Sequence, residues 1–159
     1  MTSFRIGHGH DVHRIRSGGE MKLAGVVVAT DRSFIAHSDG DVAIHAVVDA
    51  MLGALGRGDI GRHFPNTDPR WKDCDSATFL REAVRLAGEA GLAVVNLDVT
   101  ILAESPRLAP HIDAMAKNLR DAVGGQVNVK AGTNEGCDAV GRGECIVATA
   151  VVLLGPQIG

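Results

Sequence analysis

The sequence has few aromatic residues and no block of positive charge. Phe, Trp and Tyr make up 3% of the 159 residues and tyrosine is absent, so the core has to be built mainly from Val, Leu, Ile and Ala. Sixteen Lys and Arg against nineteen Asp and Glu give a net charge of −3. Because no basic cluster is present to neutralise a phosphate backbone, we expect no nucleic-acid partner.

Cysteines and long apolar runs are also scarce. Cys74, Cys137 and Cys145 are odd in number and form no Cys-x-x-Cys pair, which argues against a disulfide scaffold. No apolar run reaches the roughly 18 residues of a membrane-spanning helix, and the first residues lack the apolar stretch of a secretion signal. We therefore expect a cytoplasmic protein without a membrane partner.

The spacing of apolar residues predicts one domain, residues 1–159, of mixed α and β structure. We expect strands at 4–13, 21–28, 93–103, 126–131 and 144–154, and helices at 42–55, 76–90 and 110–123. The segments 59–75 and 132–143 lack periodicity and predict long loops, which are often functional. This order favours an α+β fold, an α/β two-layer sandwich with a mixed sheet and helices on one face.

Asp11 and His13 stand two residues apart in the first predicted strand. Their side chains should point to the same face, about 6–7 Å apart. His45 lies one helical turn beyond Asp41 and faces that strand if the helix packs on the sheet. The three residues would give three N/O ligands and one open position, which is typical of a catalytic zinc site. The spacing leaves open the alternative that each histidine satisfies a local hydrogen bond or lies at the surface.

Three other groups of polar residues suit phosphate chemistry, and two of them have a plainer alternative. Ser38 and Asp41 have the spacing of a capping box, so the polar stretch 37–41 is either functional or a helix cap. Thr133 could donate a hydrogen bond to phosphate and Glu135 could hold a hard cation such as Mg²⁺. Arg142, between two glycines, suits phosphate or a surface turn.

Several motifs in one order give the sequence a family resemblance. They are residues 5–13, 37–46, 58–61, 64–69, 128–131 and 141–144. Along essentially the whole chain the sequence resembles the 2-C-methyl-D-erythritol 2,4-cyclodiphosphate synthase family.

The resemblance implies a phosphorus–oxygen lyase of non-mevalonate isoprenoid biosynthesis. In this reaction the 2-phosphate of 4-diphosphocytidyl-2-C-methyl-D-erythritol 2-phosphate attacks the β-phosphorus, closes the cyclic diphosphate and expels CMP. Such a reaction depends mainly on positioning and charge neutralisation. The resemblance also implies a homotrimer with active sites between neighbouring subunits.

The resemblance assigns roles to residues of this sequence. It implies a zinc ion on Asp11, His13 and His45, and a second divalent cation, Mg²⁺ or Mn²⁺, met by Glu135. His37 and Thr133 would align the phosphates in the transition state. Besides Asp11, His13 and His37, the implied substrate-binding residues are Ser38, Asp59, Ile60, Gly61, Phe64, Pro65, Asn66, Thr67 and Asp68 around the methylerythritol phosphate, Ala103, Glu104, Ser105, Pro106, Arg107, Leu108, Ala109, Ala131 and Gly132 around the cytidine, and Thr133, Asn134, Glu135 and Arg142.

Two other functions remain as alternatives. One is a non-catalytic trimeric ligand-binding module of the same fold. It is disfavoured because a pure binder has no need of the metal-ligating and phosphate-binding residues together. The other is a metal-dependent phosphohydrolase, which would release free phosphate instead of a cyclic diphosphate.

Overall fold

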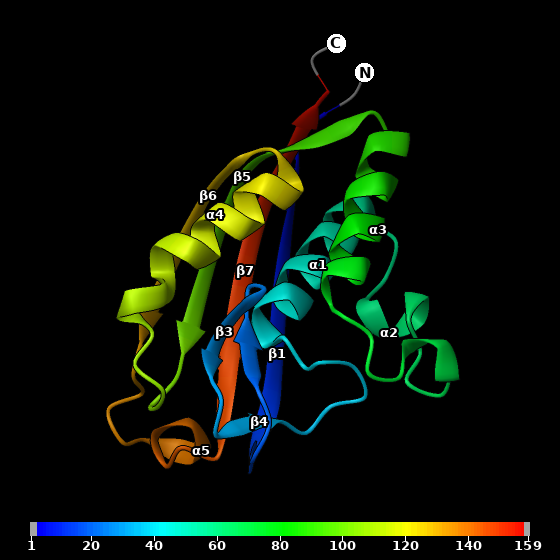
Figure 1. Ribbon diagram of the computed structural model, residues 1–159. Helices are drawn as coiled ribbons and strands as arrows, with labels where there is room; N and C mark the ends of the chain where they lie inside the picture. The colour runs from blue at the N-terminus through cyan, green and yellow to red at the C-terminus, as the bar shows by residue number, and fades with distance from the viewer. Residues whose placement is uncertain (1–2, 158–159) are drawn as a thin grey trace.

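A five-stranded mixed sheet runs through the computed structural model, which describes residues 3–157 (Figure 1). Its strands are β1 (Arg5–Ser17), β4 (Arg32–Phe34), β5 (Leu92–Leu102), β6 (Gln126–Gly132) and β7 (Cys145–Pro156), in the order β4-β1-β7-β5-β6. β5 and β6 are parallel, and the other neighbours are antiparallel. The short strands β2 (Met21–Leu23) and β3 (Val26–Ala29) form a separate hairpin.

The long helices lie against one face of the sheet (Figure 1). The long ones are α1 (Val42–Leu55), α3 (Ala77–Glu89) and α4 (Ile112–Val123), and the short ones are α2 (Ile60–His63), α5 (Asp138–Gly141) and the 3-10 turns η1 (Pro69–Trp71) and η2 (Ala109–His111). α1 packs on β1 and β7, while α4 covers β6. The mixed α and β architecture expected from the sequence is thus confirmed.

Three local predictions are wrong. Residues 21–28 form two strands, because Ala24 and Gly25 both have positive φ, 50° and 76°, and reverse the chain. The predicted loops contain α2, η1 and α5. Asp41 alone caps α1 by accepting from the backbone N–H of Ile44, so Ser38 takes no part in a capping box.

Two glycines allow α1 to lie directly on β1. Gly7 and Gly9 share the helix-facing side of the strand with Asp11 and His13, since side chains alternate along it. A Cβ atom added at Gly9 would lie 1.9 Å from the carbonyl oxygen of Ala46. The backbones therefore touch, and this close approach sets the distance between β1 and the side chains of α1.

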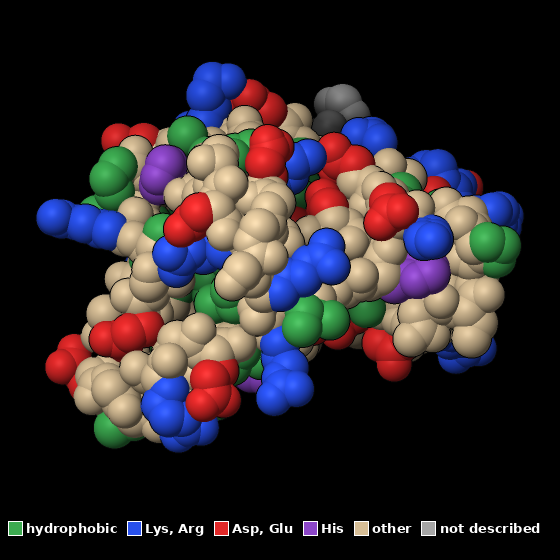
Figure 2. Space-filling view, turned by 60° about the horizontal axis from the view of Figure 1, so that its bottom comes forward, with side chains coloured by type: hydrophobic (Ala, Val, Ile, Leu, Met, Phe, Trp, Pro, Cys, Tyr) green, Lys and Arg blue, Asp and Glu red, His purple; other side chains and the backbone are tan. Residues whose placement is uncertain are grey.

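The opposite face of the sheet carries exposed apolar side chains. Ile6 is 72% exposed, Val12 49% and Val151 41%, whereas the helix-facing side chains of β7 are almost fully buried. On the face of the molecule that Figure 2 shows, Lys and Arg side chains are interspersed with Asp and Glu. No helix within residues 3–157 is long and apolar enough to cross a membrane.

Candidate functional site

A carboxylate and two imidazoles meet between β1 and α1. Oδ2 of Asp11 lies 2.9 Å from Nδ1 of His13 and 3.1 Å from Nδ1 of His45. One ligand atom from each residue lies within 4.8 Å of the other two. We call these three residues the triad. Two nitrogens and one oxygen form the ligand set of a divalent metal that keeps a further position open.

The electrostatics of the triad favour a cation. Burial raises the pKa of the Asp11 carboxyl, but the polar contacts and charge attraction of His13 and His45 outweigh burial and hold that pKa well below its usual range. Nδ1 of His13 is close to Asp11 but is not aligned for a hydrogen bond, so this buried nitrogen has no hydrogen-bond partner in the described part of the chain. A cation beside an ionised carboxylate would satisfy this lone pair. The residues present therefore fit a divalent metal.

Behind the triad, His45 contacts two serines. Its Nε2 lies 2.9 Å from Oγ of Ser76 and 3.2 Å from Oγ of Ser38. Ser76 is fully buried and also hydrogen-bonds to the carboxylate of Asp39. No sequence pattern singles out Ser76, which is 31 residues from His45 and stands at an ordinary helix start.

The triad opens onto a pocket of about 470 Å³, here called the triad pocket. Besides Asp11 and His13, seven of the predicted substrate-binding positions line it: His37, Ser38, Ile60, Gly61, Phe64, Pro65 and Asn66. Three others do not, because Asp59 caps α2, Asp68 caps η1, and Thr67 is exposed between them. The structure thus brings most of the predicted methylerythritol-phosphate positions to the triad.

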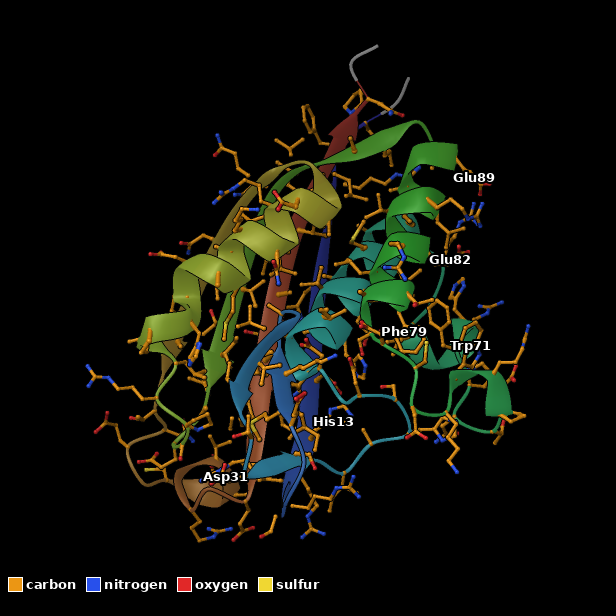
Figure 3. The ribbon with its side chains drawn as sticks, viewed as in Figure 1. His13, Asp31, Trp71, Phe79, Glu82 and Glu89 are labelled. Carbon is orange, nitrogen blue, oxygen red and sulfur yellow. The ribbon has the colours of Figure 1, made fainter. Side chains whose placement is uncertain are left out.

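An aromatic cluster forms one wall of the triad pocket. The ring centroids of Phe64 and Phe79 are 4.5 Å apart, and the ring of Trp71 lies 5.2 Å from that of Phe64. Figure 3 shows Trp71 and Phe79 close together near the first turn of α3. Sequence reasoning missed Trp71 and Phe79, since apolar residues in a loop or at helical spacing are usually core.

A second pocket, of about 300 Å³, lies at the ends of β5 and β6; we call it the strand-end pocket. It is lined by the predicted positions Ala103, Glu104, Pro106, Arg107, Leu108, Ala109, Ala131, Gly132 and Thr133, with Ile112 in addition. Ser105 instead accepts a hydrogen bond from the guanidinium of Arg32 at 3.0 Å. The two segments expected to hold a cytidine therefore do form one pocket.

The predicted phosphate-binding residues after β6 make their side-chain contacts with one another and with close neighbours in the sequence, and none with the triad. Thr133 donates to Glu135 at 3.0 Å, and both are exposed. Asn134 hydrogen-bonds to Asp138, and Arg142 pairs with Glu144 at 2.6 Å. Among the described residues, the triad pocket and the strand-end pocket share no lining residue.

Comparisons with known proteins give one consistent result. Residues 4–155 match the YgbB family. A curated relative from Thioalkalivibrio sulfidiphilus, named 2-C-methyl-D-erythritol 2,4-cyclodiphosphate synthase, is 52% identical over 157 residues, or 97% of this chain and 98% of the relative. A second of that name, from Halorhodospira halophila, is 53% identical over 94% of both chains.

Solved structures agree with the sequence matches. A Plasmodium falciparum IspF structure in complex with CDP superimposes with a TM-score of 0.87, at 32% identity and over 99% of both chains. The bifunctional IspDF of Campylobacter jejuni superimposes with a TM-score of 0.93 at 35% identity, over 98% of this chain and 43% of that one. The family expected from the sequence motifs is confirmed: the chain belongs to the YgbB family, whose curated relatives are named 2-C-methyl-D-erythritol 2,4-cyclodiphosphate synthases.

Proposed function

We propose that this protein converts 4-diphosphocytidyl-2-C-methyl-D-erythritol 2-phosphate to 2-C-methyl-D-erythritol 2,4-cyclodiphosphate and CMP. The 2-phosphate oxygen forms the new bond to the β-phosphorus, and the bond from that phosphorus to the CMP oxygen breaks. One observation carries the proposal: a triad fit for a metal opens onto a pocket lined by seven further predicted substrate-binding residues. The names of the relatives support it.

We assign zinc to the triad, since two imidazoles and one carboxylate suit that ion. When bound there, it supplies charge stabilisation to a phosphate oxygen at the reacting diphosphate. Asp11, His13 and His45 hold it, and the low pKa of Asp11 keeps that ligand ionised at neutral pH. His37 and Ser38, which line the same pocket, orient the attacking phosphate.

The aromatic cluster and the strand-end pocket fix the two ends of the substrate. Phe64, Trp71 and Phe79 exclude water from the methylerythritol end. The strand-end pocket takes the cytidine, since the two segments expected to hold it line that pocket. The CDP complex of the Plasmodium falciparum relative supports a cytidine nucleotide as the kind of ligand. Thr133 at the rim of that pocket donates to the diphosphate, and Glu135 meets a second divalent ion, Mg²⁺ or Mn²⁺.

We further propose that the protein is a homotrimer whose active sites lie between subunits. The bare face of the sheet supports this, because Ile6, Val12 and Val151 leave apolar surface open to water. The lack of side-chain contacts between the triad and Thr133 or Glu135 in the described part of one chain also supports it. A neighbouring copy would supply the missing half of each site. We place the protein in the cytoplasm, in keeping with its three free cysteines.

Phosphorus NMR of the reaction products tests the proposed function. Incubation with the cytidyl substrate, zinc and Mg²⁺ should give CMP and the cyclic diphosphate in equal amounts, and His45→Ala should give neither while remaining folded. Free phosphate as the product would establish a phosphohydrolase. Nucleotide binding without turnover would establish the non-catalytic module. Undiminished turnover by His45→Ala would overturn the zinc assignment.

A further inference from the structure

His45, Ser76 and Asp39, from three separate segments, form a chain of polar contacts behind the metal-facing side of the triad. Nε2 of His45 lies 2.9 Å from Oγ of Ser76, and Ser76 donates from that oxygen to Oδ1 of Asp39. The backbone N–H of Ser76 donates to Oδ2 of the same carboxylate at 3.2 Å. Asp39 is thus held by both the backbone and the side chain of one buried residue.

The position of Ser76 is not explained by helix capping. Ser76 is the residue before the first turn of α3, where serine often caps, yet its side chain makes no capping hydrogen bond. The hydroxyl is turned instead toward His45 and Asp39, and the residue is 0% exposed. The buried hydroxyl of Ser76 therefore makes its polar contacts with His45 and Asp39 and none with the start of α3.

The chemistry of the three groups fixes the direction of their hydrogen bonds. An ionised carboxylate only accepts, so the one hydroxyl proton of Ser76 goes to Asp39. The oxygen of Ser76 is then an acceptor toward His45, which places the imidazole proton on Nε2. Nδ1 of His45, which lies 3.1 Å from Asp11 in the triad, is left with a free lone pair. A metal ligand must present that lone pair.

We propose that Asp39 and Ser76 are positioning residues that hold His45 in the orientation and tautomer required to bind the metal. Outer partners of this kind are general for metal-bound histidines. The inference rests on the metal site under "Proposed function" and assigns two residues to it. Ser38 also lies 3.2 Å from Nε2 of His45, but its oxygen accepts from the backbone N–H of Gly40 and has no carboxylate bonded to its hydroxyl. The shorter contact, with Ser76, therefore sets the tautomer.

Two isosteric or nearly isosteric changes test the proposal through metal affinity. In Asp39→Asn the side-chain amide can donate to Ser76, whose proton can then turn to Nε2 and leave Nδ1 protonated. Ser76→Ala removes the hydroxyl that connects His45 to Asp39. Metal-free wild type and variants are titrated with Zn²⁺ against a chromophoric chelator and with Co²⁺ by visible absorption. Both variants should bind about 10–100-fold more weakly, the usual loss for an outer partner, with a changed Co²⁺ spectrum.

Matched controls separate positioning from folding. Asp73→Asn removes a negative charge from an exposed residue of the same region and keeps its positive φ of 55°, which Asn tolerates, so it should bind both metals as wild type does. Ser76→Thr keeps a hydroxyl and should recover metal affinity relative to Ser76→Ala. Each metal-free variant is also unfolded in urea, because a purely structural role would lower stability without altering the Co²⁺ spectrum.

The outcomes are distinct from those for the proposed function. If wild type binds zinc and Asp39→Asn binds it within twofold with an unchanged Co²⁺ spectrum, the positioning role is refuted while the metal site stands. An equal loss in Asp73→Asn would also refute it. If wild type itself binds neither metal, the metal site fails. Weaker metal binding by both Asp39→Asn and Ser76→Ala, with wild-type binding by Asp73→Asn and recovered binding by Ser76→Thr, establishes the positioning role.

Discussion

Replacing Gly9 by Ala should damage the metal site by pushing α1 away from β1 on the face that carries Asp11 and His13. The new Cβ would lie 1.9 Å from the carbonyl oxygen of Ala46, whereas ordinary contact begins at 3.4 Å. α1 would therefore have to move away from β1 by roughly 1.5 Å, because both partners in the clash are backbone or fixed to it. Since His45 belongs to α1 and Asp11 to β1, that shift separates ligands that now lie 3.1 Å apart.

The size of the effect follows from the rigidity of the contact. Overpacking of this kind costs about 1–3 kcal/mol, which urea unfolding of the zinc-loaded protein should measure. Zinc ligands need to be within about 0.5 Å of their productive positions, so zinc affinity in a chelator competition should fall at least about tenfold, the equivalent of 1.4 kcal/mol.

Gly53→Ala is the control. It lies in the same helix, and its new Cβ would meet only the carbonyl oxygen of His8 at 3.9 Å. It should be neutral or stabilising by up to about 1 kcal/mol, because Ala is the better helix former. Wild-type stability and zinc affinity in Gly9→Ala would refute the argument that backbone contact sets the triad geometry.

Three other predictions follow from single features. Asp41→Asn should destabilise the protein by about 1–3 kcal/mol in urea. The buried carboxylate of Asp41 accepts from three backbone N–H groups, and in the variant at least one of these donors would face the NH₂ of the new amide. An unchanged urea midpoint would contradict this. The folded pKa of Asp11 lies below its unfolded value, so its contribution to metal-free stability is present above about pH 4 and is lost as the pH falls further. Asp11→Asn should therefore flatten the decline in urea stability below about pH 4, and parallel profiles would refute this. Val151→Lys should yield monomers in sedimentation velocity if the bare sheet face is the trimer interface; a stable trimer would place the interface elsewhere.

The long elements and the triad could be predicted from the sequence because each has a local signature. α1 and β7 show apolar periodicity, and Asp11 and His13 have the two-residue spacing that places side chains on one face of a strand. His45 then needs only the packing of α1 on β1, which Gly7 and Gly9 permit. The structure brings the three together as expected.

The short elements and the position of Ser76 behind the triad could not be predicted, because they depend on tertiary contacts that leave no periodic pattern in the sequence. α2 is a single turn whose first N–H donates to Asp49, eleven residues earlier, and so short a helix has little stability of its own. The carboxylate of Asp41 stabilises the chain reversal by accepting from the backbone N–H groups of Ala24, seventeen residues away, and Gly25, sixteen residues away. Ser76 joins Asp39 across 37 residues. Such pairs are specified by the folded chain as a whole.

The most direct test of the proposed active site is complementation between two inactive chains. His45→Ala lacks a ligand of the triad, and Glu135→Ala lacks the carboxylate after β6 that is proposed to bind the second divalent ion. The two chains are co-expressed with different tags, and only assemblies that carry both tags are purified and assayed for CMP and the cyclic diphosphate. A site made between neighbouring subunits leaves about one intact site in three in every mixed trimer, and so about a third of wild-type turnover. No recovered activity in the mixed trimers, each variant being folded, would contradict a site shared between subunits.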